Sequence, residues 1–324
     1  MHTRKELQDI ITAAFHSANF HFEPASLYDP IKYMMDLGGK RLRPLLTLMS
    51  CDMFGGNTND ALDPAMGLEL FHNFTLLHDD IMDQAPIRRG RQTVFKKWNT
   101  NSAILSGDTL FVMAYELVTK TTPTLLPQVL GLFNDTARKV CEGQQYDMDY
   151  ELRGDVSIDD YIVMIKLKTA VLISCSLKLG AIIAKAPAGE AELIYAFGEN
   201  LGLAFQLQDD YLDVFGDVDK FGKEIGNDIV TNKKTFLYLK AFELADPKSL
   251  ELLKTNFHDG SIPGHEKVKM ITNIYKELKI DLLTRSIIDE YYAKALGIMA
   301  GIDIPEDRKL LLLEIAGQMV NRDN

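Results

Sequence analysis

Residues 76–90 read "LLHDDIMDQAPIRRG", and residues 205–217 read "FQLQDDYLDVFGD". Each stretch holds the pattern Asp-Asp-x-x-Asp directly after an apolar run with helical spacing. In a helix, the first and last aspartates of this pattern lie about 40° apart around the axis and about 6 Å apart along it, so their carboxylates point to the same side. Carboxylates stacked near a helix C-terminus repel one another and oppose the helix dipole. The pattern therefore predicts two helices that end in sites for a cation.

Helical spacing of apolar residues continues along most of the chain. No stretch shows the sustained two-residue alternation of a strand, and only short segments rich in glycine, proline and polar residues separate the runs. No linker rich in glycine, serine or proline divides the chain. We therefore expect an all-α protein in which residues 1–324 form a single domain, a large bundle of about ten to fifteen helices. The main helical runs are 61–83, 100–120, 126–152, 157–185, 191–216 and 266–302.

The composition indicates a globular protein and excludes some partners. At 324 residues, with 46% hydrophobic and 25% charged residues, the chain can bury a large core. Its net charge of −11 argues against nucleic acid, which basic surfaces bind. No apolar run reaches the roughly 18 to 20 residues that span a bilayer, and the start, "MHTRKELQDIITAAFHSANF", is charged and amphipathic rather than secretory. We expect a cytoplasmic protein without stable membrane insertion.

The three cysteines are far apart in the sequence and have no paired spacing. Neither a disulfide framework nor a zinc site is therefore expected. Because free cysteine is among the most buried residue types, we expect Cys51, Cys141 and Cys175 to be reduced thiols in the core.

Basic residues accompany both acidic clusters. The stretch "LGGKRLRP" (37–44) places Lys40, Arg41 and Arg43 in a glycine turn before a helix that starts near Pro44. Glycine lets groups approach a phosphate closely, and arginine offers a forked donor that phosphate oxygens accept. Further bases follow the first acidic cluster or flank the second: Arg88, Arg89, Arg91, Lys168, Lys223, Lys233 and Lys234.

Two interpretations of these clusters compete. One acidic cluster alone is often only a solvated helix end, and one basic pair is often only a solvated loop. Two aspartate clusters that alternate with several bases instead favour a site for Mg²⁺, a hard cation that takes oxygen ligands, keeps waters and is shared with substrate phosphates. The sequence therefore favours two half-sites that face each other across one cavity and bind an anionic, phosphorylated substrate.

A series of motifs carries a family resemblance. In chain order stand "GGKRLRP" (38–44), "HNFTLLHDDIMD" (72–83), "RRG" (88–90), "SGDTL" (106–110), "GQQYDM" (143–148), "KLKTA" (166–170), "FQLQDDYLD" (205–213) and "GKEIGNDIVTNKKT" (222–235). Together they resemble the trans-isoprenyl diphosphate synthases, also called polyprenyl synthetases, over nearly the whole chain. The combination is highly specific, whereas one DDxxD motif is not. The resemblance implies the isoprenoid synthase type I fold, with helices around a central cavity, and a homodimer.

The resemblance also implies the reaction. Isopentenyl diphosphate would be condensed with an allylic diphosphate, head to tail and in trans, to a short linear product. Three Mg²⁺ ions, assembled with the substrate diphosphate, and cationic side chains would neutralise the leaving group while the allylic carbon–oxygen bond ionises. The double bond of isopentenyl diphosphate would then attack the cation, and the departing diphosphate would take the proton. No side chain is assigned as general base.

The motif positions imply the roles of individual residues. Catalytic roles fall to Asp79, Asp80, Asp83, Lys168, Thr169, Gln206, Asp209, Asp210 and Asp213. The implied metal ligands are Asp79, Asp83 and Asp209. The allylic diphosphate would be bound by Arg88, Lys168, Thr169, Gln206, Lys223 and Lys233. Isopentenyl diphosphate would be bound by Lys40, Arg43, His72 and Arg89. The reacting centre would also be lined by Gln144 and Asp147.

His72 fits its implied role physically. It precedes Asp79 by seven residues, about two helical turns, and therefore lies on the same stripe of the helix. A lone helical histidine is otherwise an ordinary packed or exposed residue, so its position relative to the acidic cluster decides the assignment.

Product length depends on a second stripe of the same helix. Phe71, Phe74, Thr75 and His78 are spaced i, i+3, i+4, i+7 and should line the pocket for the growing chain. In the family that the chain resembles, an aromatic residue five positions before the first motif, here Phe74, accompanies short products. Phe71 and Phe74 therefore indicate farnesyl or geranylgeranyl diphosphate, unless both rings are merely core. Thr75 stands where animal-type farnesyl synthases place a second aromatic ring, which favours geranylgeranyl diphosphate.

Other activities remain as alternatives. A longer-chain polyprenyl diphosphate synthase would share every motif. A class I terpene cyclase also ionises a diphosphate, but its second metal site is usually not a DDxxD motif, and it lacks "GGKRLRP". A non-catalytic partner subunit would have lost motif residues, and a structural or metal-buffering helical protein gives no reason for bases to alternate with acids.

Overall fold

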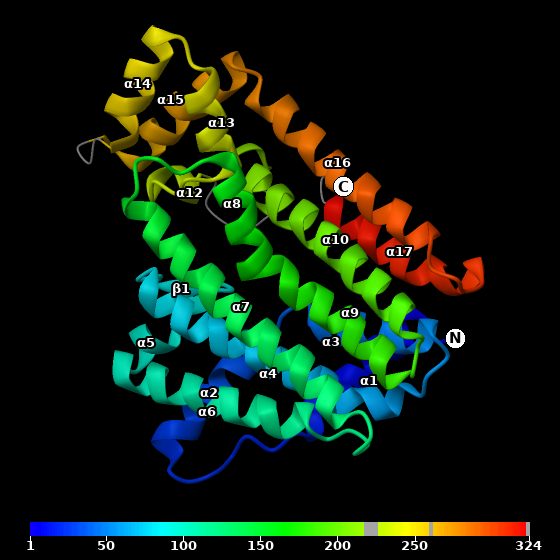
Figure 1. Ribbon diagram of the computed structural model, residues 1–324. Coiled ribbons are helices and arrows are strands. Elements are labelled where there is room, and N and C mark those ends of the chain that lie inside the picture. The colour runs from blue at the N-terminus through cyan, green and yellow to red at the C-terminus, as the bar shows by residue number, and fades with distance from the viewer. Residues whose placement is uncertain (217–225, 259–261, 322–324) are drawn as a thin grey trace. The chain divides into compact units, whose positions relative to one another are not determined.

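The computed structural model describes residues 1–216, 226–258 and 262–321. Helices make up most of this part of the chain and a short hairpin is its only sheet (Figure 1), which confirms the expected all-α class. The contacts between residues divide the chain into two compact units. The single domain over residues 1–324 stays a prediction. No helix within the described residues combines the length and the apolar character that crossing a bilayer requires.

The first unit comprises Met1–Asp135, Cys175–Ile194 and Asp303–Leu312. A short antiparallel hairpin, β1 (Ile87–Arg88) and β2 (Arg91–Gln92), follows its longest complete helix. Each strand has only two residues, too few for a periodic pattern, so the sequence did not predict the hairpin. The helices that lie wholly in this unit are α1 (Arg4–Ser17), α2 (Ala25–Asp36), α3 (Leu42–Met53), α4 (Thr58–Met82), α5 (Val94–Lys97) and α6 (Thr100–Val118).

Helix α4 is the central element of the first unit and packs against both α3 and α6 (Figure 1). Asn57 caps the N-terminus of the helix, because its side chain accepts a hydrogen bond from the backbone N–H of Asn59. A helix covered on several sides is apolar almost all round. Consistent with this, Leu68 and Leu70 are both buried although residues two apart lie on opposite faces of a helix. The acidic residues at the end of α4 therefore follow a largely buried stretch of the helix.

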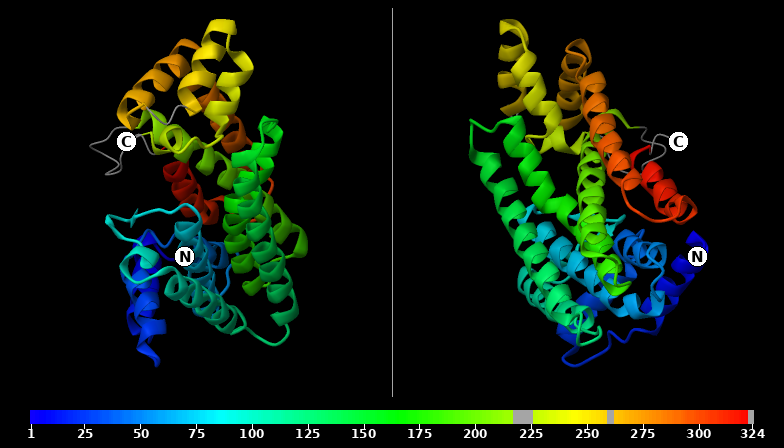
Figure 2. Two further views of the ribbon diagram at one scale, coloured as in Figure 1. Left: turned by 90° about the vertical axis from the view of Figure 1, so that its left-hand side faces the viewer. Right: turned by 45° about the vertical axis from the view of Figure 1, so that its right-hand side comes forward.

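The second unit comprises Thr136–Ser174, Tyr195–Ile302 and Leu313–Asn324. Helices α14 and α15 lie side by side in it (Figure 2), and α13 and α16 pack against α15 and against each other. Its complete elements are α8 (Ile158–Ile165), the π turn η1 (Lys166–Ala170), α12 (Asn227–Val230), α13 (Phe236–Leu244), α14 (Pro247–His258), α15 (Gly264–Glu277) and α16 (Ile280–Ala300). Four helices contribute residues to both units: α7 (Leu126–Leu152), α9 (Val171–Ile183), α10 (Ala188–Phe215) and α17 (Glu306–Val320).

Two of the predicted runs are interrupted. The π turn η1 divides run 157–185 into α8 and α9, and Lys279, with a left-handed φ of 58°, separates α15 from α16 within run 266–302. Neither interruption disturbs the apolar spacing, so periodicity alone could not reveal it. The prediction that all three cysteines are core thiols is wrong for one of them. All three are free, but Cys141 is exposed because it lies on the outward face of α7.

Gly143 permits a close approach between α7 and the π turn. A Cβ atom at this position would lie 2.3 Å from the backbone nitrogen of Lys168. A backbone atom cannot swing away as the end of a flexible side chain does, so the two elements would have to separate. The spacing between them therefore depends on the absence of a side chain at residue 143.

The substitution Gly143→Ala should lower the free energy of unfolding by about 1–3 kcal/mol, the usual cost of overpacking. Urea denaturation checks this. Gly131→Ala in the same helix is the control, because a Cβ there meets nothing within 4 Å. Because alanine has a better helix propensity than glycine, Gly131→Ala should raise the free energy of unfolding by up to about 1 kcal/mol. Equal effects of the two substitutions would contradict the packing argument.

Candidate active site

The first acidic cluster lies at the C-terminal end of α4. Asp80 is only 1% exposed, Asp79 is half-buried, and Asp83 is the exposed residue that ends the helix. Arg88 on β1 folds back onto the cluster. Its Nε donates to Asp80 Oδ1 at 2.7 Å, and its Nη2 donates to Asp79 Oδ2 at 3.3 Å. The structure thus brings together an arginine and two aspartates that the sequence singled out.

The pKa of Asp80 reflects this environment. Burial raises the pKa of its carboxyl to about 6, while the charge of Arg88 and its hydrogen bond act in the opposite direction. The second oxygen of Asp80, Oδ2, is buried and has no hydrogen-bond partner within the described residues. Asp80 is therefore a buried partner of Arg88, whereas Asp79 and Asp83 are more exposed to solvent.

A basic cluster surrounds Glu69, one helical turn before His72 on α4. Glu69 is 3% exposed, and burial raises the pKa of its carboxyl, while the charges of Arg43, Arg89 and Arg41 lower it. The charges of three arginines therefore act on Glu69, whose Oε2 is buried and has no hydrogen-bond partner within the described residues. The sequence analysis missed Glu69, although a single acidic residue inside the apolar run 65–71 was a visible signal.

The glycine turn before α3 lies against the side chain of Arg89. Gly39 has φ +138°, and a Cβ atom there would lie 2.8 Å from the guanidinium carbon of Arg89. Glycine thus leaves room for that guanidinium. Burial, followed by the charges of Arg43, Arg89 and Arg88, lowers the pKa of His72 well below its ordinary value, so its imidazole is neutral. Lys40 lies on the exposed side of the turn.

An aromatic cluster extends from the chain-length stripe of α4. The ring of Phe74 stacks on that of Phe111 from α6, with centroids 4.9 Å apart and planes 7° apart, and it meets the ring of His78 edge-on at 4.8 Å. Phe71 contacts Phe74 at 5.6 Å and Phe111 at 5.4 Å. Thr75 instead donates its hydroxyl hydrogen to the carbonyl of His72 on its own helix. The sequence analysis missed Phe111, because no local spacing connects it with Phe74.

The second acidic cluster lies near the C-terminal end of α10. Asp210 is 6% exposed, and both of its oxygens accept hydrogen bonds. The hydroxyl of Tyr161 on α8 donates to Oδ2, and Gln206 Nε2 donates to Oδ1 at 2.9 Å. Thr169 of the π turn in turn donates to Gln206 Oε1 at 3.0 Å. A chain of hydrogen bonds therefore orients three of the predicted residues, and Tyr161, which the sequence analysis missed, ends it.

Asp213 belongs to the same surroundings. The backbone N–H of Asp228 donates to Asp213 Oδ2 at 2.9 Å, which ties α12 to α10. Burial raises the pKa of Asp228 well above its ordinary value, Asp210 and Asp213 raise it further, and Lys233 opposes them. The charge of Lys233 also lowers the pKa of Asp210. The predicted lysine thus lies close to two buried acids.

The π turn presents two further predicted residues. Lys168 Nζ donates to Asp147 Oδ2 of α7 at 2.6 Å, and π turns often mark functional positions in helices. Gln144, also on α7, has a buried side-chain nitrogen without a hydrogen-bond partner within the described residues. Lys223 lies outside those residues.

The carboxylates suit a hard cation only when other ligands take part. Within residues 1–216, 226–258 and 262–321, no three histidine, cysteine or acidic side chains gather closely enough to hold a metal ion by themselves. The three predicted metal ligands are at least partly exposed to solvent: Asp79, Asp83 and Asp209. Two other aspartates, Asp80 and Asp210, are buried and accept hydrogen bonds from side chains. This donor set fits Mg²⁺, which completes its shell with water and phosphate oxygens.

Comparisons with known proteins agree with one another. A family profile for polyprenyl synthetase matches residues 24–278. Geranylgeranyl diphosphate synthase of Methanosarcina mazei is 36% identical over 303 residues, 93% of this chain and 91% of that protein. Geranylfarnesyl diphosphate synthase of Natronomonas pharaonis is 36% identical over 237 residues, 68% of this chain and 70% of that protein. A crystal structure of a geranylgeranyl pyrophosphate synthase matches with a TM-score of 0.95 and 46% identity, covering 100% of both chains.

An all-α protein with two aspartate clusters and accompanying bases has the features of an enzyme that acts on diphosphates. The chain belongs to the polyprenyl synthetase family. It is a trans-prenyltransferase, so the predicted family, fold class and type of reaction are confirmed. Enzymes of this family generally depend on Mg²⁺.

Removal of the Tyr161 hydroxyl should have a pH-dependent effect. Burial raises the pKa of Asp210 to about 7, so the folded state loses stability as the pH rises from about 4, where unfolded aspartate titrates, to about 7. Tyr161 favours the charged form by donating to it. Tyr161→Phe should therefore raise the pKa of Asp210 further. At a pH well above 7, each additional unit of pKa shift should lower the free energy of unfolding by about 1.4 kcal/mol.

Urea unfolding of the metal-free enzyme at about pH 6 and about pH 9 measures this difference. Tyr275→Phe, at a buried tyrosine of α15, is the control and should cost the same at both pH values. If Tyr161→Phe also cost the same at both, its hydroxyl would not be the donor that charged Asp210 uses.

Proposed function

We propose that the enzyme condenses isopentenyl diphosphate with an allylic diphosphate and releases geranylgeranyl diphosphate. The observation that supports this product is the aromatic cluster of Phe71, Phe74 and Phe111, in which Phe74 lies five residues before the first aspartate motif. Chain elongation would stop where the growing prenyl tail meets these rings. Relatives named geranylgeranyl diphosphate synthase favour the same product length.

The allylic diphosphate would be bound by residues that accompany the two aspartate motifs. Arg88, Lys168 and Lys233 would contribute charge, and Lys223 would add to it. Arg88 donates to Asp80 and Lys168 donates to Asp147, so an acid orients each of these two cations. Such preorganised cations cost little reorganisation when negative charge develops on the leaving group.

Isopentenyl diphosphate would bind at the basic cluster around Glu69. The charges of Arg43 and Arg89 reach Glu69 and lower the pKa of its carboxyl, and neutral His72 can accept or donate a hydrogen bond without adding charge. Lys40, on the exposed side of the glycine turn, would close over the diphosphate. We add Glu69 to this set as a positioning residue, because its charge would attract the arginines.

Asp79, Asp83 and Asp209 would hold the metal, in the set of three ions that the family resemblance implies. Bound Mg²⁺ would supply the Lewis-acid charge that makes the diphosphate a leaving group. Asp80 and Asp210 would not be ligands, because both are buried. Arg88 donates to Oδ1 of Asp80, and Tyr161 and Gln206 donate to the two oxygens of Asp210. Their part is to fix the helix ends.

Thr169, Gln206 and Gln144 would face the allylic carbon. The hydrogen bonds from Thr169 to Gln206 and from Gln206 to Asp210 determine which way the amide of Gln206 points: its oxygen faces Thr169. An oriented amide oxygen stabilises nearby positive charge, as an allylic cation requires. The departing diphosphate would take the proton lost after condensation, so no side chain is needed as a base.

We also propose that the enzyme is a homodimer. Leu105 and Val112 of α6 are 58% and 60% exposed in the single chain and lie about two turns apart on one face of the helix. Exposed apolar faces of this kind mark contact surfaces. A cytoplasmic location stays a prediction. A longer-chain product, such as geranylfarnesyl diphosphate, is the alternative that the relative from Natronomonas pharaonis keeps open.

Substitution of single metal ligands should abolish turnover while the fold is kept. Asp79→Asn and Asp209→Asn should each lower kcat roughly a thousandfold, because each removes a carboxylate charge that would bind the Mg²⁺ of the diphosphate leaving group. A Mg²⁺-dependent assay with isopentenyl and farnesyl diphosphates measures kcat, and circular dichroism measures folding. Asp63→Asn, on the same helix as Asp79 and paired with Lys120 at 3.7 Å, is the control and should leave kcat unchanged. Near-normal turnover of both ligand variants would refute the proposed metal site.

Truncation of the aromatic cluster should lengthen the product. Phe74→Ala and Phe111→Ala each open space below the first motif, so the main product should grow by at least one isoprene unit. Chromatography of the dephosphorylated products measures the length. Phe242→Ala removes a ring from the separate cluster with Tyr238 and Phe257, and it should leave the product unchanged. An unchanged product from Phe74→Ala would exclude Phe74 from the floor of the pocket.

A further inference from the structure

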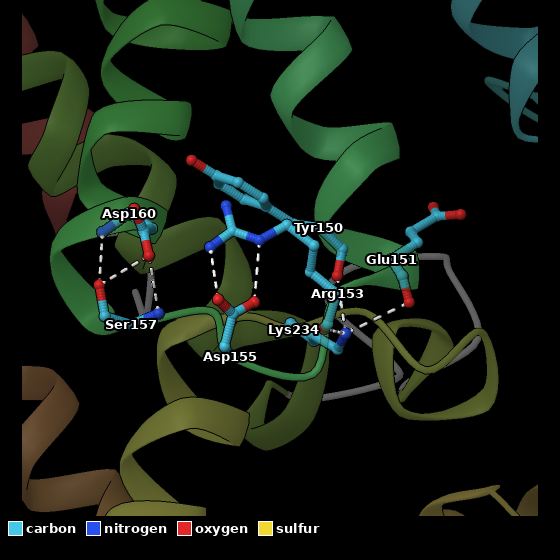
Figure 3. A network of polar contacts seen from close by, with 7 residues as sticks. All are labelled: Tyr150, Glu151, Arg153, Asp155, Ser157, Asp160 and Lys234. Carbon is cyan, nitrogen blue, oxygen red and sulfur yellow. Dashed lines mark hydrogen bonds and ion pairs between the residues drawn. The ribbon is translucent and has the colours of Figure 1, made fainter.

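Lys234 joins two segments that are far apart in the sequence. Its Nζ donates to the carbonyl oxygens of Tyr150 at 2.7 Å and Glu151 at 3.2 Å, and also to that of Arg153 (Figure 3). These carbonyls stand at and just beyond the C-terminal end of α7, where the helix leaves its last acceptors without partners. An ammonium group there also compensates the negative end of the helix dipole. Lys234 thus ties the segment after α12 to the end of α7.

The carbonyls that Lys234 contacts belong to an ordered connection. Arg153 donates to Asp155 twice, from Nε at 2.9 Å and from Nη2 at 3.1 Å (Figure 3). Ser157 and Asp160 then form a capping box that starts α8. The connection from α7 to α8 therefore has its own hydrogen bonds, which fix the carbonyl groups that Lys234 contacts.

The residues on both sides of Lys233 are fixed by lysine ammonium groups. Asn232, in a left-handed conformation with φ 61°, accepts a hydrogen bond on Oδ1 from Nζ of the buried Lys267. Lys234 is held at α7. The backbone N–H of Lys233 itself donates to the carbonyl of Asp228 at 2.9 Å. The main chain at Lys233 is therefore held at three points, while its side chain lies near Asp210 and Asp228.

We infer that Lys234 is a positioning residue for the allylic diphosphate site, which it serves by holding Lys233 in place from the end of α7. This inference rests on the proposed function, in which Lys233 binds the allylic diphosphate. Lys234 has no part in the chemistry, since its ammonium is occupied by three carbonyls. Without it the main chain at Lys233 loses one of its three restraints, and the cation that meets the diphosphate loses its orientation.

Steady-state kinetics of Lys234→Met test the inference, because methionine keeps the apolar stem and removes the ammonium. The KM for farnesyl diphosphate should rise about tenfold, which corresponds to about 1.4 kcal/mol. The KM for isopentenyl diphosphate should stay within about twofold, since its proposed binding residues belong to the first unit and do not include this segment. Lys234→Arg should restore most of the affinity, because a guanidinium can also donate to several carbonyls. Lys254→Met, at an exposed lysine of α14, should change neither KM.

The variants also separate a positioning role from a purely structural one. A structural role would lower the melting temperature without distinguishing the two substrates, and that result would overturn the inference. If Lys234→Met does not fold, Lys234→Gln, which retains an amide donor for the carbonyls, takes its place. It should give a smaller rise in the same KM, and a rise shared by both substrates would again overturn the inference.

A double-mutant cycle distinguishes failure of this inference from failure of the proposed function. Lys233→Ala alone should raise the KM for farnesyl diphosphate; if it does not, the proposed role of Lys233 is wrong. In the Lys233→Ala background, Lys234→Met should add less than about a twofold effect, because the residue that it positions is gone. An undiminished tenfold effect in that background would show that Lys234 acts by another route.

Discussion

The burial of carboxylates is the physical constraint on which the rest of this enzyme depends. An isolated ionised carboxylate inside a protein is costly unless donors surround it. Here the charges of three arginines act on Glu69, Arg88 donates to Asp80, and Tyr161 and Gln206 donate to Asp210. Each buried acid therefore places cations or oriented dipoles, and those same groups are the ones that a diphosphate or an allylic cation would meet.

The two aspartate motifs show the same difference in burial between their members. In each motif the second aspartate is buried and engaged in hydrogen bonds, and the first is more open. The buried member anchors the helix end, which leaves the open members for a cation. Lys168 and Arg88 show the complementary arrangement, since each of these cations is oriented by an acid.

Local patterns in the sequence predicted what local physics controls. Apolar spacing predicted α4 and α10 and the position of an acidic cluster at the end of each, because a helix forms from interactions three and four residues apart. The family resemblance then assigned most of the site residues. Contacts between distant residues left no such pattern: Tyr161 meets Asp210 across 49 positions, and Lys234 meets Tyr150 across 84. The π turn at Lys166–Ala170 was missed because its residues keep helical apolar spacing while the backbone widens.

The central claim is that both aspartate motifs bind the same metal–diphosphate assembly. A crystal structure of the enzyme grown with Mg²⁺ and an unreactive allylic diphosphate analogue tests it most directly. The account predicts carboxylate oxygens of Asp79, Asp83 and Asp209 about 2.0–2.1 Å from ions that share the oxygens of one diphosphate. Ions bound by one motif alone, with the other motif turned to solvent, would contradict it.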